Sequence, residues 1–254
     1  MAPKVIFLMA DYGHDPTETA IPWQVFKNAG FEVFFATETG QSPRCDDRML
    51  SGWTGTLLGA NGAARTAYAA LSTTSPNFQR PLSWIDFEFN LEDYDLVFLP
   101  GGHEKGVRQI IDSPRVHYLL KSYFPNTKKP SSKCLAAICH GVQVLAMAST
   151  TEGRSILHDV HTTALPAVME QGIFHATKLF LGDYYKTYGA GTASVEDIVK
   201  ENLANKKQFA SSISPRPFVV EDPCYNYLSA RFPPDAELLA KKAVEMVNAV
   251  RQPA

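Results

Sequence analysis

Ala136-Ala137-Ile138-Cys139-His140-Gly141-Val142-Gln143 is the stretch that decides the fold. Residues 135–138 form a short apolar run typical of a buried parallel strand, and a helix is predicted to follow at once, over about residues 140–149. The residue at the turn is a cysteine. Its small neighbours Ala137 and Gly141 suit a sharp strand-to-helix turn, because the backbone passes close to itself there. The pattern predicts a nucleophile elbow with Sγ at the edge of the sheet.

The thiol of Cys139 would lie at the N-terminus of that helix, where the partial positive charge favours a thiolate. The backbone N–H of His140 would point at the same space and serve an oxyanion hole. The alternative is a buried core cysteine that merely ends a strand, since cysteine is among the most buried residue types. No elbow pattern surrounds the other cysteines, which are Cys45, Cys134 and Cys224.

The N-terminal part of the chain predicts a β-α-β unit. Residues 5–10 form a continuous apolar run, and residues 31–36 form a second one. Between them, Asp15-Pro16-Thr17-Glu18 combines an N-cap residue, a proline at the first helical position and a glutamate at the third. The helix should extend to about Asn28 and end at Gly30. Such crossovers are nearly always right-handed, so the two strands should be parallel neighbours.

Strands continue to alternate with helices further along the chain. Apolar runs predict strands at residues 95–99, 218–221 and 225–230. Helices are expected at 113–124, at 194–205 and at 235–250, and residues 163–180 have helical spacing with an interruption near Gly172. The fold class is therefore α/β, a mostly parallel sheet with helices on both faces.

The length of 254 residues fits one α/β domain with additions. Residues 40–84 are longer than an ordinary connection. They carry Trp53, Tyr68 and Trp84 and one Ala-rich stretch at 60–71 that should be helical, so we expect a cap laid over the sheet. A second addition is expected at about residues 180–215. The whole chain, 1–254, is then a single domain.

Composition excludes several classes of protein. The chain is 45% hydrophobic and 20% charged, which rules out intrinsic disorder. Its net charge is −2 with no basic block, so a nucleic-acid partner is not expected. No apolar run approaches the ~18–20 residues of a membrane span, and the N-terminal run is too short for a signal peptide. Four unevenly spaced cysteines do not make a disulfide scaffold. These features predict a cytoplasmic protein with no membrane partner.

Three loops leave strand ends with polar or reactive residues: 11–18, 101–106 and 139–141. In open parallel sheets ligands bind beyond the carboxyl ends of the strands, so these loops form the candidate site. The backbone amides of Gly102 and His103 would add oxyanion donors, although a tight turn would also explain the glycines. The His103 side chain is either a substrate contact or a surface residue. Glu18 is either a capping-box carboxylate or an acid beside the thiol, where its pKa would be raised.

The sequence leaves the partner of His140 open. A general base must reach the thiol at about 2.6–3.2 Å, and an adjacent residue on an elbow does not automatically do so. Asp11, Glu104 and Asp159 are all possible orienting acids. Metal binding is not predicted, because HxxxH and CxxC spacings are absent from the sequence. A phosphate loop is absent too, so no cofactor is expected.

Taken together, these motifs resemble the ThiJ/PfpI superfamily, whose members are class I glutamine amidotransferase-like proteins with a flavodoxin-like core. The resemblance rests on Val97-Phe98-Leu99-Pro100-Gly101-Gly102-His103, on the 139–141 elbow and on the 15–18 motif. Residues 225–233 and 235–250 are similar to the family's last strand, turn and helix. The resemblance implies that Cys139 is the nucleophile, that Glu18 lies against it, and that the protein acts on a small molecule and forms a homodimer.

The insertion after the second strand is similar to the glyoxalase III and chaperone-like branch of the family. That branch converts methylglyoxal to lactate without a cofactor, which makes it a lyase. The resemblance implies a hemithioacetal on Cys139, proton transfer from C1 to C2 by Glu18 or His140, and hydrolysis of a thioester.

Several departures from the branch bear on the substrate. Val142 replaces the branch's usual proline, and residues 162–166 replace the histidine that some compact members carry downstream of the cysteine. The metal ligands of some chaperone-like members have no clear match. The segment 182–189 lies outside the common core and would line a larger pocket. Candidate substrate contacts are therefore His103, Trp23, Tyr184 and Tyr185.

Two alternatives remain open from the sequence. One is a hydratase or hydrolase that acts on an amide, an isonitrile or a specialised metabolite. The other is a redox-sensing or holding protein in which Cys139 is oxidised and no turnover occurs.

Overall fold

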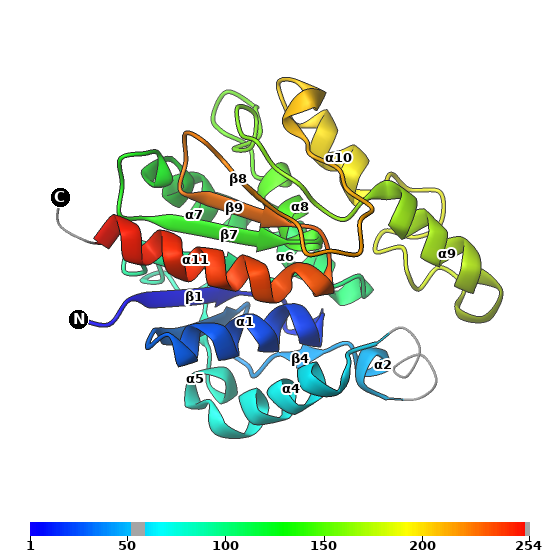
Figure 1. The fold of residues 1–254 in the computed structure, drawn as a ribbon, viewed down its shortest axis with the longest axis horizontal. Helices are drawn as coiled ribbons and strands as arrows, with labels where there is room; N and C mark the ends of the chain where they lie inside the picture. The colour runs from blue at the N-terminus through cyan, green and yellow to red at the C-terminus, as the bar shows by residue number, and fades with distance from the viewer. Residues whose placement is uncertain (52–58, 252–254) are drawn as a thin grey trace.

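The main sheet has seven strands and is parallel except at one edge. A computed structural model of the protein describes residues 1–51 and 59–251. In spatial order the strands are β5 (Leu82–Ser83), β3 (Glu32–Thr37), β1 (Lys4–Leu8), β6 (Leu96–Leu99), β7 (Cys134–Ile138), β9 (Tyr227–Ala230) and β8 (Val219–Glu221) (Figure 1). Only the pairing of β8 with β9 is antiparallel. The predicted mostly parallel sheet is confirmed.

The order of the five central strands indicates at which edge of the sheet the candidate site lies. Chain order β1, β3, β6, β7, β9 becomes spatial order 2-1-3-4-5, the flavodoxin-like arrangement. The winding reverses between β1 and β6, where Val5 is in register with Leu96. Ligands bind at the carboxyl ends of strands beside such a switch point. The loops that follow β1, β6 and β7 all leave the sheet at this edge.

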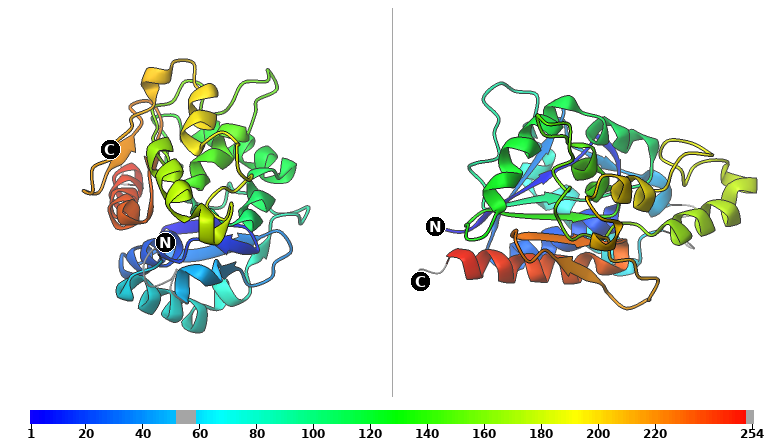
Figure 2. Two further views of the ribbon diagram at one scale, coloured as in Figure 1. Left: turned by 90° about the vertical axis from the view of Figure 1, so that its right-hand side faces the viewer. Right: turned by 90° about the horizontal axis from the view of Figure 1, so that it is seen from above.

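Helices cover both faces of the sheet, as expected (Figure 2). One face packs against α1 (Pro16–Asn28), α4 (Gly62–Thr74) and α11 (Ala236–Arg251). The other packs against α6 (Arg108–Ile111), α7 (Pro114–Tyr123), α8 (His140–Met147) and α10 (Val195–Glu201). Four short 3-10 turns complete the connections: η1 (Lys105–Val107), η2 (Phe124–Thr127), η3 (Lys206–Gln208) and η4 (Pro233–Asp235). No helix within the described ranges is long and apolar enough to cross a bilayer.

Local signals in the first β-α-β unit act as predicted. The Asp15 side chain accepts from the backbone N–H of Thr17 at 2.7 Å and of Glu18 at 3.0 Å, which caps α1. Gly30 follows the helix with φ of 80°, a conformation that suits glycine after a C-cap. The chain then enters β3 directly. Helix α1 therefore begins and ends where its caps predict.

Residues 40–84 extend the core on one side. Strand β4 (Arg44–Cys45) pairs with β2 (Tyr12–His14), and α2 (Asp47–Leu50) follows. Further along, α4 packs on α1, α5 (Pro76–Gln79) packs on β3, and β5 adds a strand to the sheet. Trp53 lies outside the described residues. Tyr68 and Trp84 are buried.

The second half differs from the expectation in detail. Helix α9 (Ala167–Leu181) begins after Pro166 rather than at residue 163. It continues without interruption through Gly172, whose Cβ position is open, so the glycine weakens the helix only modestly. Helix α10 ends at Glu201 rather than near residue 205. In both Figure 1 and Figure 2, α9 projects from the body beside the carboxyl edge of the sheet.

A fully buried ion pair fastens the end of the second addition to the core. The guanidinium of Arg231 binds both carboxylate oxygens of Asp235 at 2.8 Å. It also donates to the backbone carbonyls of Ser212, Ser214 and Arg216. Because every donor of the planar fork is used, the pair fixes the course of residues 212–216 over the last strand.

Candidate active site

The elbow at Cys139 is strained in the way its sequence predicts. Its φ is 57° and its ψ is −124°, and within the described ranges it is the only non-glycine residue with a positive φ. A Cβ on Gly141 would lie 2.2 Å from the carbonyl oxygen of Leu99, so only glycine fits there. The Cys139 N–H donates to the carbonyl of Ala230 at 3.1 Å. The surrounding backbone thus holds a conformation that most side chains avoid.

Glu18 turns toward the elbow instead of capping its own helix. Its Oε2 accepts the N–H of Gly101 at 2.9 Å, while Asp15 caps α1. A Cβ on Gly101 would lie 2.7 Å from both Cys139 Cβ and Glu18 Oε2, so the three residues meet in one crowded contact. The other oxygen, Oε1, is buried and has no hydrogen-bond partner in the described part of the chain. A free carboxyl oxygen is therefore available to a ligand.

His140 contacts the thiol through Nδ1, at 3.4 Å from Sγ. Its Nε2 lies 2.9 Å from the hydroxyl of Thr187, and that hydroxyl donates to the carbonyl of His103 at 2.9 Å. A threonine hydroxyl has one proton. Since the proton is directed at a carbonyl, the hydroxyl must accept from Nε2–H. Neutral His140 then carries its proton on Nε2, and Nδ1 is free to accept the thiol proton.

Thr187 takes the place in which the sequence suggested an acid. Asp11 instead accepts from Gln109, Glu104 accepts from the backbone of Gly106, and Asp159 contacts His158. None of the three acids bonds to His140. No single-sequence signal marks Thr187, because it lies in the irregular segment after α9 and reaches His140 across 47 positions.

Burial decides the protonation states at this site. Burial, reinforced by the Glu18 carboxyl, raises the pKa of the Cys139 thiol well above its ordinary value. Burial and the nearby Asp15 likewise raise the pKa of Glu18 well above 4.5. Burial lowers the pKa of His140 to about 3. The helix N-terminus was expected to favour a thiolate, but desolvation of a thiol only 6% exposed outweighs it. The resting site holds a neutral thiol beside a neutral imidazole.

A cavity of about 280 Å³ opens over the thiol. Its lining residues are Asp15, Glu18, Met49, Gly102, His103, Cys139, Leu165, Met169, Glu170, Ile173, Tyr185, Phe232 and Pro233. Neither backbone amide of Gly102 or His103 has a hydrogen-bond acceptor within the described ranges. These amides are free donors beside the Cys139 thiol, where the sequence predicts an oxyanion hole. The His140 amide is directed at the thiol sulfur.

The expected substrate contacts separate into three groups. Tyr185 lines the cavity and stacks on the His103 ring, with centroids 4.4 Å apart. Tyr184 lies behind them and donates to Asp46, so it supports His103 without lining the cavity. Trp23 is 4% exposed in the core between α1 and the sheet. Trp23 is not among the residues that line the cavity, so its contact with substrate stays a prediction.

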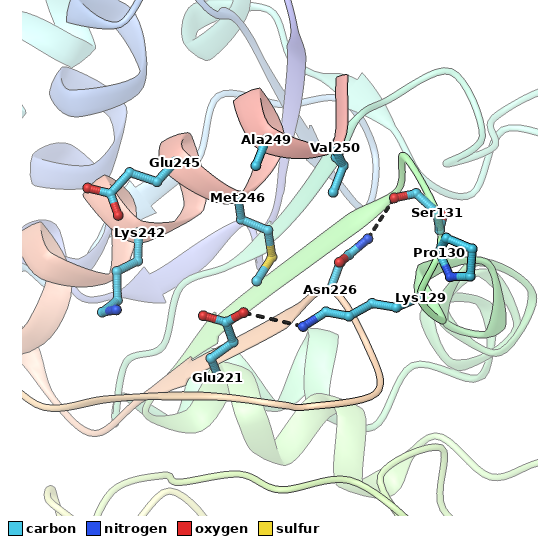
Figure 3. Close-up of a pocket in the computed structure, with 10 residues that line it drawn as sticks. All are labelled: Lys129, Pro130, Ser131, Glu221, Asn226, Lys242, Glu245, Met246, Ala249 and Val250. Atoms are coloured by element: carbon cyan, nitrogen blue, oxygen red, sulfur yellow. Dashed lines mark hydrogen bonds and ion pairs between the residues drawn. The ribbon is translucent and has the colours of Figure 1, made fainter. Parts of the chain in front are cut away.

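A larger cavity lies away from this chemistry. It measures about 560 Å³ and opens between α11, Glu221 of β8 and residues 129–131 (Figure 3). Ser131 and Asn226 precede β7 and β9, so this cavity is near the amino ends of the strands, opposite Cys139. Two pairs of its polar residues contact each other: Lys129 Nζ donates to Glu221 at 3.3 Å, and Asn226 Nδ2 donates to the Ser131 carbonyl at 2.8 Å. No cluster of three or more His, Cys, Asp or Glu suited to a metal ion occurs in the described part of the chain.

Comparisons with known proteins agree with this fold. The family described as ThiJ/PfpI family-like matches residues 9–212. An uncharacterised protein of Schizosaccharomyces pombe is 29% identical over 96% of this chain and 84% of its own length. A glutathione-independent glyoxalase of the same yeast is 27% identical, but the match spans 60% of this chain and 59% of that protein. The crystal structure of glyoxalase III from Candida albicans superimposes with a TM-score of 0.67, covering 96% and 97% of the two chains at 16% identity.

Proposed function

This chain belongs to the ThiJ/PfpI family, and on that premise we propose that it is a cofactor-independent, glyoxalase III-like enzyme. In this proposal Cys139 attacks a small reactive carbonyl compound and the reaction converts a 2-oxoaldehyde such as methylglyoxal to a 2-hydroxy acid such as lactate. The observation that carries the proposal is the contact of the Cys139 thiol with His140 Nδ1 in a cavity that is also lined by Glu18, whose buried Oε1 has no hydrogen-bond partner in the described part of the chain. The glyoxalases among the relatives support the same reading.

In the first step the Cys139 sulfur forms a bond to the aldehyde carbon, C1. The thiol proton passes to His140 Nδ1, which lies 3.4 Å from Sγ and carries no proton at rest. Negative charge develops on the former carbonyl oxygen, beside the free amides of Gly102 and His103. Such donors, fixed before the reaction, stabilise an oxyanion most strongly where water is excluded. His140 then returns the proton to this oxygen, which completes the hemithioacetal.

In the second step one proton moves from C1 to C2, and another moves from the C1 oxygen to the C2 oxygen. Glu18, as a carboxylate, takes the proton from C1 and delivers it to C2 through an enediol. A carboxylate whose pKa is raised by burial is a stronger base than an ordinary one, which suits removal of a carbon-bound proton. His140 moves the hydroxyl proton from the C1 oxygen to the C2 oxygen. The product of this step is a thioester on Cys139 with a hydroxyl at C2.

In the third step water attacks the thioester carbon and gives one of its protons to His140 Nδ1. The bond from Sγ to C1 breaks, the thiol recovers a proton from His140, and the 2-hydroxy acid leaves. The same elbow, base and oxyanion donors would serve each addition and elimination. We propose a lyase rather than a hydrolase, because thioester hydrolysis is only the last of the three steps.

The test is incubation of the protein with methylglyoxal and chromatographic measurement of lactate. Wild type is expected to form lactate without glutathione, and Cys139→Ala is expected to lose at least 100-fold in kcat, since covalent catalysis requires the thiol. Cys224→Ala is the matched control, because Cys224 is exposed and lies away from the cavity. Lactate formation by Cys139→Ala at the wild-type rate would refute the proposal.

A further inference from the structure

The cavity over the thiol is lined by a few polar groups and by many apolar side chains. Resting on the proposed function, we propose that the preferred substrate is an uncharged 2-oxoaldehyde whose substituent is apolar and larger than a methyl group. The polar groups that would take part in the reaction are the thiol, Glu18 and the free amides. The remaining wall is formed mainly by apolar side chains: Met49, Leu165, Met169, Ile173, Phe232 and Pro233.

The volume of the cavity exceeds what methylglyoxal needs. At about 280 Å³ the cavity is many times larger than the roughly 10–15 Å³ that a single water needs. Methylglyoxal offers one methyl group to the apolar wall and would leave most of that wall in contact with water. A longer alkyl substituent would displace this water, and removal of apolar surface from water is the driving force for such binding.

The charges around the cavity favour an uncharged substituent. None of the described lining residues is Lys or Arg, whereas Asp15, Glu18 and Glu170 are acids. Lys186 lies behind the wall, but its Nζ is 2.7 Å from Glu170 Oε1, and the two side chains are 1% and 4% exposed. The second Glu170 oxygen accepts from the Val195 amide at 2.9 Å. A carboxylate on the substrate would therefore find no cation at this wall to pair with it.

Helix α9 supplies both a wall residue and a matched control. Ile173 and Met169 are one turn apart and both line the cavity. Val168 belongs to the same helix, but it is 61% exposed and does not line the cavity. Serine at Ile173 or at Val168 replaces a β-branched apolar side chain with a small polar one. Only the change at Ile173 should alter the contact with a substituent.

The experiment compares kcat/KM for methylglyoxal, propylglyoxal and pentylglyoxal, which differ little in aldehyde reactivity. Each buried methylene is expected to raise kcat/KM about fourfold, so propylglyoxal should exceed methylglyoxal roughly fifteenfold. Ile173→Ser should lower kcat/KM for pentylglyoxal roughly tenfold more than for methylglyoxal. Val168→Ser should leave both values at the wild-type level. Far-ultraviolet circular dichroism checks that both variants keep their helices.

Two failures are distinguishable in this experiment. Turnover of methylglyoxal with no gain for the longer aldehydes would overturn the inference and leave the proposed function standing. An equal loss for all three aldehydes in Ile173→Ser would overturn it as well. If none of the aldehydes is converted to a 2-hydroxy acid, the proposed function fails and the inference fails with it.

Discussion

Replacement of Thr187 by valine tests the protonation state assigned to His140. Valine keeps the shape of threonine but removes the hydroxyl that links His140 Nε2 to the His103 carbonyl, at 2.9 Å on each side. Two buried groups then lose their partner. Each buried group left unpaired costs about 1–3 kcal/mol, so the free energy of unfolding should fall by at least about 1 kcal/mol.

The effect on catalysis is separate from the effect on stability. Without the hydroxyl, the neutral imidazole is free to place its proton on Nδ1, where it would face the thiol and could not accept from it. General base catalysis contributes about 10²–10⁴-fold, and part of the population would retain the correct tautomer. We therefore expect kcat for a 2-oxoaldehyde to fall roughly 10- to 100-fold. KM should stay at the wild-type value, because Thr187 does not line the cavity.

The assay is steady-state formation of the 2-hydroxy acid, combined with urea unfolding. Thr187→Ser is the matched control, since it keeps the hydroxyl and should keep kcat within about threefold of wild type. The Nε2–H tautomer assigned to His140 is wrong if Thr187→Val keeps kcat within twofold of the wild-type value. It is also refuted if the serine variant loses as much as the valine variant, because a lost methyl group would then explain both.

Three further predictions concern charge and burial. In the proposed mechanism Glu18 acts as a base only when ionised, and burial raises its pKa, so kcat/KM should rise with pH through a limb above pH 4.5. His140, whose pKa is about 3, is already neutral in this range. If the pH profile of Glu18→Gln keeps this limb, the limb belongs to another group. Arg231→Met leaves the Asp235 carboxylate buried without its partner and should lower the free energy of unfolding by about 3–5 kcal/mol, measured in urea; a loss under 1 kcal/mol would contradict the described ion pair. Burial raises the pKa of the Cys139 thiol and so reduces the fraction of thiolate, the form that reacts with peroxide. Mass spectrometry after peroxide treatment should therefore find the exposed Cys224 oxidised first. Conversion of Cys139 to sulfinate before Cys224 is oxidised would favour a redox role instead.

Much of the fold follows from local signals in the sequence. The caps at Asp15 and Gly30, the small residue at 141 and the apolar strand runs each specify a short segment, and parallel crossovers bring the ends of those segments to one edge. Cys139 and Glu18 meet because they follow β7 and β1 at that edge. The thiol, its acid and the free amides could therefore be proposed from sequence.

The rest depends on contacts between segments with no regular pattern. Thr187 and Tyr185 reach the site because the loop after α9 is held by the buried Lys186, and nothing in the spacing of residues 182–189 specifies that approach. Trp23 shows the converse: it lies on a helix that leads away from the site, and it is buried in the core cluster and does not line the cavity. The protonation of the thiol was missed because desolvation is a property of the assembled cavity.

The buried ion pair of Lys186 with Glu170 holds a cation behind the cavity wall whose charge is neutralised by its partner. While both partners are present, the pair presents no net positive charge to the cavity. A single change of Glu170 to glutamine would leave the ammonium unpaired behind the wall, at a cost in stability that an anionic ligand could offset. A descendant of this protein could thus exchange the proposed preference for apolar aldehydes for acidic ones in one mutational step, with Cys139, His140, Glu18 and the free amides unchanged.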